Sequence, residues 1–178
     1  DKAFIGGSLA ATFFQGVTLG AFLDGFTVVD GAHVGGSWDW VKPFPIFVGL
    51  ALTVAYALLG ATWLILKTEG DLQKRMIALA KPLTFGLIAV IAVVSLWTPF
   101  AHPAIGERWF SLPNLFWFAP VPLLVALSAW WLLRSLRGEP HAAPFILTLC
   151  VIFLGYSGLG ISLWPMAIPP DITIWQAS

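Results

Sequence analysis

Residues 60–75 read GATWLILKTEGDLQKR, and this stretch decides the fold. Its first half completes a long apolar run, whereas its second half carries Lys67, Lys74 and Arg75 together with two acidic side chains. Basic residues beside a membrane-crossing helix are retained on the cytoplasmic side. The stretch therefore predicts a membrane-spanning helix that ends near Lys67 and is followed by a charged cytoplasmic loop.

The composition of the whole chain points to the same environment. Of the 178 residues, 58% are hydrophobic and 10% are charged, and the mean hydropathy is +0.87. About a quarter of the residues in a soluble domain are charged, so this is the composition of a membrane protein. The net charge is zero and the basic residues are scattered, which excludes a nucleic-acid-binding surface. Cys150 is the only cysteine, which excludes an intramolecular disulfide and a cysteine-based metal site within this chain.

Five apolar runs are long enough to cross a membrane, because a spanning helix needs about 20 mostly apolar residues. We therefore predict an all-α, polytopic bundle that forms a single membrane domain over residues 1–178. No run carries an acidic or basic side chain in its interior, where such groups mark ion paths or cofactor partners. Four runs begin at a proline, which suits the first turn of a helix. The predicted spans are residues 3–23, 43–66, 82–100, 113–133 and 144–164.

Small residues and prolines predict local features of these spans. Gly16 and Gly20 form a GxxxG pair, which lets a neighbouring helix approach closely, and we expect that neighbour in another part of a longer chain. Pro120 and Pro122 lie inside the fourth span and predict a kink near Phe118. Residues 24–42 contain Asp and His side chains, but their spacing matches no compact ligand pattern and their glycines indicate turns. We interpret this segment as a solvated loop.

The distribution of basic residues predicts the orientation of the chain. When successive loops are placed on alternate sides, seven basic residues fall on one side and two on the other. The richer side is expected to be cytoplasmic, so the loop at Gly70 lies inside and the tail after Trp164 lies outside. The seven are Lys2, Lys67, Lys74, Arg75, Lys81, Arg134 and Arg137, and the two are Lys42 and Arg108.

The tail is the second diagnostic stretch, with the sequence WPMAIPPDITIWQAS over residues 164–178. Its consecutive prolines cannot continue a helix, and Trp175 is suited to a membrane interface. This tail and the stretch at residues 60–75 resemble two stretches of subunit II of the cytochrome bd family of quinol oxidases. The two stretches occur in the same order in this chain as in that family. The residues that carry the resemblance are Gly60, Ala61, Trp63, Lys67, Thr68, Glu69, Gly70, Trp164, Pro165, Pro169, Pro170 and Trp175.

The resemblance implies a function for the whole chain. The five spans are similar to the fourth to eighth helices of subunit II, so the chain is expected to be part of a longer subunit whose acidic proton-path residues lie elsewhere. The family reduces dioxygen to water with electrons from the quinol pool, in the bacterial cytoplasmic (inner) membrane. Haems b and d are expected in the partner, subunit I, for which this chain serves as a scaffold. The resemblance also allows this chain to contact membrane lipid or a structural quinone.

The residue types in this chain favour a role at the interface with another subunit. They do not favour a catalytic role. Axial haem ligands are His, Met or Cys side chains that project into the site, but all three histidines fall in predicted loops and Cys150 stands alone. We therefore predict no catalytic, cofactor-binding or metal-binding residue here. A fragment of a transporter or permease is the alternative, as is a structural subunit of another complex. Transporters carry polar or charged groups at mid-membrane depth. The mid-span candidates here are Gln15, Ser95, Tyr156 and Ser157.

Overall fold

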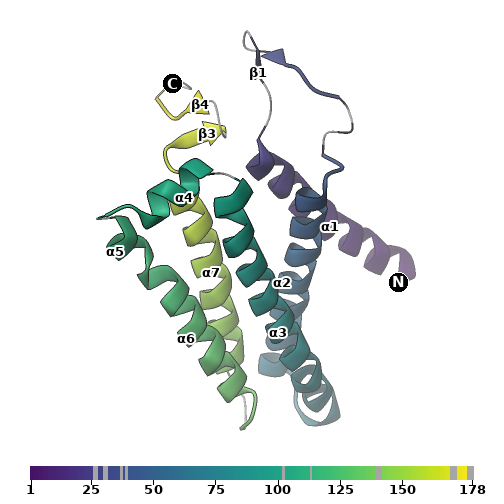
Figure 1. Ribbon diagram of the computed structural model, residues 1–178. Helices are drawn as coiled ribbons and strands as arrows, with labels where there is room; N and C mark the ends of the chain where they lie inside the picture. The colour runs from purple at the N-terminus through teal and green to yellow at the C-terminus, as the bar shows by residue number, and fades with distance from the viewer. Residues whose placement is uncertain are drawn as a thin grey trace. The chain divides into compact units, whose positions relative to one another are not determined.

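The computed structural model describes residues 1–25, 28–29, 32–36, 38, 40–101, 103–112, 114–138, 142–168 and 172–175. Within these residues, five helices are long and apolar enough to cross a membrane (Figure 1). This confirms the predicted all-α membrane fold. The helices are α1 Lys2–Asp24, α2 Pro43–Lys67, α3 Gly70–Ala101, α4 Pro103–Phe110, α5 Asn114–Phe118, α6 Pro120–Ser135 and α7 Ala143–Leu163.

Two short antiparallel hairpins accompany the helices in the described part of the chain. In the first, β1 Val28–Val29 pairs with β2 Ala32–His33 between α1 and α2. In the second, β3 Met166–Ile168 pairs with β4 Ile172–Thr173 after α7. The chain divides into two compact units: unit 1 consists of Asp1–Tyr56 and Leu163–Ser178, and unit 2 of Ala57–Ser162. The single membrane domain stays a prediction.

Unit 1 is organised by a close contact between α1 and the first half of α2. A Cβ atom added at Gly16 would lie 2.7 Å from the Cα atom of Gly49, and one added at Gly20 would lie 2.6 Å from the Cα atom of Pro45. The GxxxG pair therefore packs on α2 within this chain, and the expectation of a partner elsewhere was wrong. A contact at this distance requires glycine, because any side chain would force the two backbones apart.

The buried side chains of unit 2 gather toward one end. This end, which we call the basic end, is where α2 ends, α3 begins, α6 ends and α7 begins (Figure 1). α3 contacts α6, and the side chain of Val121 in α6 lies 3.4 Å from the position of a Cβ atom at Gly158 in α7. Most of the buried side chains in unit 2 lie in the half of each helix that is nearer the basic end, and Leu87 lies near the middle of α3. Those nearer the basic end are Leu58, Ala61, Thr62, Ile65, Ala80, Thr84, Ala129, Leu132, Leu136, Pro144, Thr148 and Val151.

The third spanning helix differs from its prediction. It was expected to begin at Pro82 after a charged cytoplasmic loop, but α3 begins at Gly70 and contains Pro82 in its interior. Residues 71–81 are rich in Leu, Ala, Lys, Arg and Gln, which are strong helix formers. Asp71 lies in the first turn, where a negative charge stabilises the positive end of the helix dipole. Lys74, Arg75 and Lys81 are therefore helical residues.

The segment between the third and fourth spans also differs from its prediction. Residues 101–112 were expected to form a short loop, but they contain α4, which begins at a proline as first helical turns often do. The interruption predicted near Phe118 is present, because α5 ends at Phe118 and α6 begins at Pro120. Proline lacks the backbone N–H that would have continued the ladder of the preceding turn. The fourth span is thus built from two consecutive helices.

Candidate functional site

The first diagnostic stretch forms a capped hairpin between α2 and α3. The Oγ1 atom and the backbone N–H of Thr68 donate hydrogen bonds to the carbonyl of Leu64 at 2.7 and 2.9 Å. The side-chain amide of Gln73 donates to the carbonyl of Ile65 at 2.9 Å. These donors satisfy carbonyls that the end of a helix leaves without partners. Gly70 has a φ of 69°, which is accessible to glycine at little cost, so the turn requires this residue.

In this stretch, α2 has one buried and one exposed face. Ala61 is buried together with Leu58, Thr62 and Ile65. On the opposite face, Gly60 has no atom within 4 Å of an added Cβ position, and Trp63 is 45% exposed. Lys67 is also exposed on this side. The motif residues therefore divide between packing within unit 2 and a surface that is open in this chain.

The exposed face of α2 carries a cluster of rings and charge. The rings of Trp63 and Phe145 meet edge to face with their centroids 5.1 Å apart, which links α2 to α7. The Nζ atom of Lys67 lies 5.0 Å from the centroid of the Trp63 ring. An indole attracts a cation over its face and packs against apolar neighbours with its edge. Trp63 therefore serves as an anchor at the helix end.

The second diagnostic stretch forms a small structure of its own in unit 1. The rings of Trp164 and Trp175 meet edge to face at 5.9 Å, and the N–H of Ile174 donates to the carbonyl of Pro165 at 3.0 Å. Together with the β3–β4 hairpin, these contacts fold the tail back on its own first residues, which follow α7. The motif prolines at positions 169 and 170 lie outside the described residues.

Buried polar side chains in unit 2 are satisfied by their own helices. The hydroxyls of Thr62, Thr84 and Thr148 each donate to the carbonyl four residues earlier, at 2.9, 2.7 and 2.8 Å. Across the described residues, every buried side-chain nitrogen or oxygen has a hydrogen-bond partner. These buried hydroxyls already have partners within the described part of unit 2, so they need no ligand.

A family model for cytochrome bd terminal oxidase subunit II matches residues 1–178. The chain belongs to this family. A comparison with curated protein sequences found no match. The chain is therefore a subunit of a cytochrome bd oxidase and a multi-pass membrane protein of electron transport. The family match favours the oxidase interpretation over a transporter or permease.

The family is part of a haem-containing oxidase, but the described residues contain no group of three His, Cys, Asp or Glu side chains that could hold a metal ion. Asp24, one of the acidic residues considered above, pairs with Lys42 at 2.7 Å. In unit 1, a shallow hollow of about 250 Å³ is lined by Phe14, Val17, Thr18 and Trp40. The Thr18 hydroxyl donates a hydrogen bond to the carbonyl of Phe14 in its own helix.

Two contacts of this oxidase subunit could not be anticipated from the motif alone. Gln73 closes the end of α2 from three residues beyond the turn glycine, and Phe145 supplies the ring against Trp63. A glutamine after a glycine turn is a weak signal, because many charged loops contain one. Phe145 lies 82 positions further along the chain than Trp63, so no local pattern joins them.

Proposed function

We propose that this chain is the scaffold partner of the haem-bearing subunit I in a quinol:oxygen oxidoreductase of the bacterial cytoplasmic membrane. Subunit I carries haems b and d and reduces dioxygen with electrons from the quinol pool. This chain ligates no haem and performs no step of the reaction. Membrane lipid, or a structural quinone, covers part of its apolar surface. The family match over the whole chain is the observation that carries the proposal.

The part of the exposed face of α2 around Gly60 is the surface that we assign to subunit I. Gly60 lies on the exposed face of α2, whereas the opposite face is buried inside unit 2. Trp63 and Lys67 continue the exposed face into the last turns of the helix, beyond the part that we assign to subunit I. Gly60 is open to close approach, since nothing within this chain lies within 4 Å of its Cβ position. Small residues at such a place allow two membrane helices to meet at van der Waals distance. Helix packing in lipid depends on this contact because the hydrophobic effect does not drive it.

Replacing Gly60 with leucine tests this assignment. The added side chain enters an open surface of the chain but would separate it from subunit I, at a cost of about 1–3 kcal/mol by analogy with overpacked cores. We expect less assembled oxidase in the membrane, measured by haem absorbance, and near-normal turnover per haem in the complexes that remain. Gly160→Leu is the matched control, because Gly160 is also an exposed helical glycine with nothing within 4 Å. Equal assembly of the two variants would remove Gly60 from the interface.

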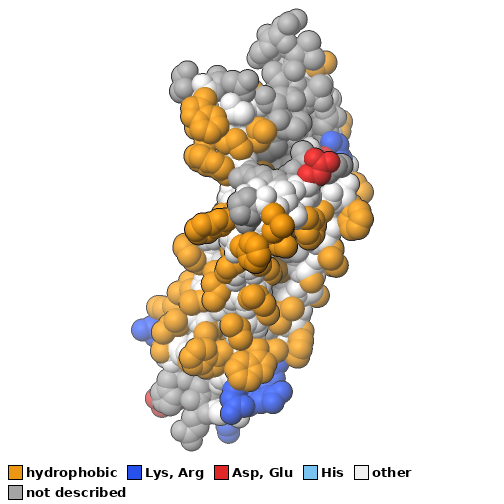
Figure 2. Space-filling view, turned by 60° about the vertical axis from the view of Figure 1, so that its left-hand side comes forward, with side chains coloured by type: hydrophobic (Ala, Val, Ile, Leu, Met, Phe, Trp, Pro, Cys, Tyr) orange, Lys and Arg blue, Asp and Glu red, His pale blue; other side chains and the backbone are white. Residues whose placement is uncertain are grey.

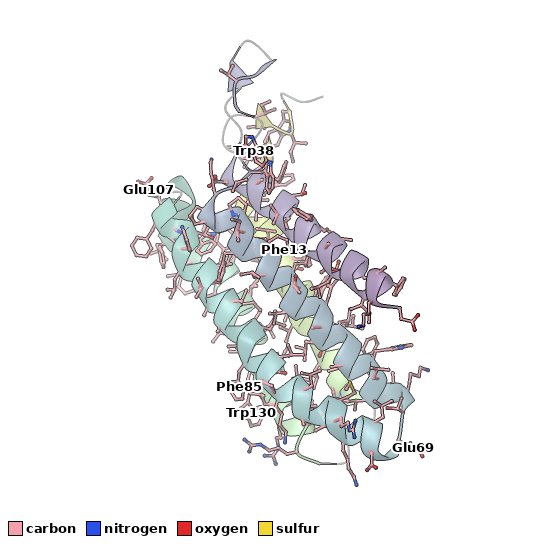
Figure 3. The ribbon with its side chains drawn as sticks, turned by 90° about the vertical axis from the view of Figure 1, so that its right-hand side faces the viewer. Phe13, Trp38, Glu69, Phe85, Glu107 and Trp130 are labelled. Atoms are coloured by element: carbon pink, nitrogen blue, oxygen red, sulfur yellow. The ribbon has the colours of Figure 1, made fainter. Side chains whose placement is uncertain are left out.

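Replacing Glu69 with glutamine distinguishes a scaffold role of this stretch from a catalytic role. Its exposed carboxylate lies beside the turn, near the basic end of unit 2 and far from Glu107 (Figure 3). A solvent-exposed charge pair at the edge of an interface contributes about 0–1 kcal/mol, so Glu69→Gln should weaken assembly only slightly. Loss of turnover in a fully assembled Glu69→Gln complex with all its haems would instead place this residue in a proton or quinol site.

A further inference from the structure

Two spanning helices of unit 2 end in the same arrangement of an indole ring and a cation. In α2, the Nζ atom of Lys67 lies 5.0 Å from the ring centroid of Trp63. In α6, the Cζ atom of Arg134 lies 5.9 Å from the ring centroid of Trp130. Both pairs are four residues apart in sequence and occupy the last turns of their helices. Residues with this spacing share a face, which lets the cation lie over the ring.

The two arrangements lie at the same end of unit 2. Both helices run toward the basic end, where α2 turns into α3 and α6 leads to α7 (Figure 1). Hydrophobic side chains cover much of the face seen in Figure 2, and Lys and Arg side chains gather at one end of it. A cation in the last turn of a helix is stabilised by the negative end of the helix dipole. Both helices therefore present a positive group where their apolar surface ends.

Exposure leaves both arrangements accessible. Trp63 is 45% exposed and Trp130 is 62% exposed, and both cations are exposed as well. An indole is favoured at the level of the lipid head groups, because one part of it is apolar and its N–H is polar. The ring restricts the flexible side chain above it while leaving the positive charge in place. Each cation is thus held at head-group depth with less entropy left to lose when an anion binds.

The charge of the basic end selects an anionic ligand. The described residues at this end include the acidic side chains Glu69 and Asp71. Against these stand six basic residues, Lys67, Lys74, Arg75, Lys81, Arg134 and Arg137. Arg binds phosphate with two parallel hydrogen bonds and Lys binds it as a point charge. We propose that the basic end binds the phosphate groups of anionic phospholipids, with Lys67 over Trp63 and Arg134 over Trp130 as two head-group contacts.

Lipid titration of the intact, delipidated oxidase complex tests the proposal. Native mass spectrometry would count bound phosphatidylglycerol, with phosphatidylcholine and inorganic phosphate as the comparison ligands. Lys67→Gln and Arg134→Gln should each weaken phosphatidylglycerol binding about five-fold, which is the effect of one cation near an anionic membrane. Lys74→Gln is the matched control, because Lys74 is an exposed lysine at the same end without a ring contact in the described structure. We expect a smaller loss for Lys74→Gln.

Further variants keep the test decisive if a glutamine variant fails to assemble. Lys67→Arg retains the charge and should bind the lipid like the unchanged protein. Trp63→Phe retains an apolar ring with a weaker attraction for cations, so it should weaken binding about two- to five-fold. Equal losses for Lys67→Gln and Lys74→Gln, or unchanged binding in Trp63→Phe, would overturn the proposal. So would equal affinity for phosphatidylcholine, or displacement of the lipid by inorganic phosphate at equal concentration.

Discussion

Replacing Gly16 with alanine adds one methyl group at the tightest part of unit 1. The new carbon would lie 2.7 Å from the Cα atom of Gly49 and 2.8 Å from the carbonyl oxygen of Val48. Carbon atoms pack best at about 3.5–4.0 Å, so the contact is too short by roughly 1 Å. Both obstructing atoms belong to the backbone and cannot rotate away. The helices α1 and α2 must therefore separate along this contact.

The expected cost follows from comparing two changes on the same helix. Overpacking costs about 1–3 kcal/mol, whereas alanine gains up to about 1 kcal/mol over glycine in helix propensity. Gly6→Ala is the matched control, because Gly6 lies in α1 with nothing within 4 Å of its Cβ position. The propensity gain is common to both variants and cancels in the comparison. We expect Gly16→Ala to be less stable than Gly6→Ala by about 1–3 kcal/mol.

Reversible unfolding of the full chain in mixed micelles measures this difference. Titration with a denaturing detergent, followed by circular dichroism, gives the free energy of unfolding for each variant. Gly20→Ala provides an independent repeat, because its methyl carbon would lie 2.6 Å from the Cα atom of Pro45. The reasoning fails if Gly16→Ala and Gly6→Ala unfold at the same detergent fraction, because the backbones of α1 and α2 would then not be in contact.

Three further predictions concern the turn, the orientation and the haems. Gly70→Ala should lower the free energy of unfolding by about 1–2 kcal/mol because its φ is positive, whereas Gly138→Ala, with open space around it, should be neutral in the same titration. A cysteine at Asp71 should react with an impermeant reagent only from the cytoplasmic side, and one at Ser178 only from outside; the reverse pattern would invert the orientation. The isolated chain should purify without a Soret band. A stoichiometric band that disappeared on replacing one histidine would contradict the scaffold role.

Much of the fold could be predicted because a membrane imposes a simple rule on sequence. A spanning helix must be apolar over about 20 residues, and α1 and α7 end within one residue of their predicted bounds. The rule failed where polarity changes inside a continuous helix. Residues 71–81 are too polar for lipid but favour a helix, so α3 extends from the charged region through Pro82. Hydropathy locates the part of a helix that lies in lipid, and it does not locate the end of the helix.

The candidate site was less predictable because its contacts join distant parts of the chain. The stretch at residues 60–70 indicated a helix end and a glycine turn, and both are present. The face that it leaves exposed, and the contact of Trp63 with Phe145, depend on how α2 packs in unit 2. The partner of Gly16 likewise depends on the return path of the chain. Small residues predict that a close contact exists, and only the folded chain identifies the partner.

The distribution of buried residues in unit 2 supports the proposal that this chain acts through its surface. Packing is concentrated toward the basic end, whereas large apolar side chains elsewhere remain open, with Phe100 86% exposed, Leu123 64% and Phe153 71%. Within the described interior, the buried threonine hydroxyls are bonded to their own helices. No buried side-chain nitrogen or oxygen in the described residues lacks a hydrogen-bond partner. The surfaces that we propose for subunit I and for lipid are therefore exposed faces of these helices, distinguished by Gly60 and by the two indole–cation pairs respectively.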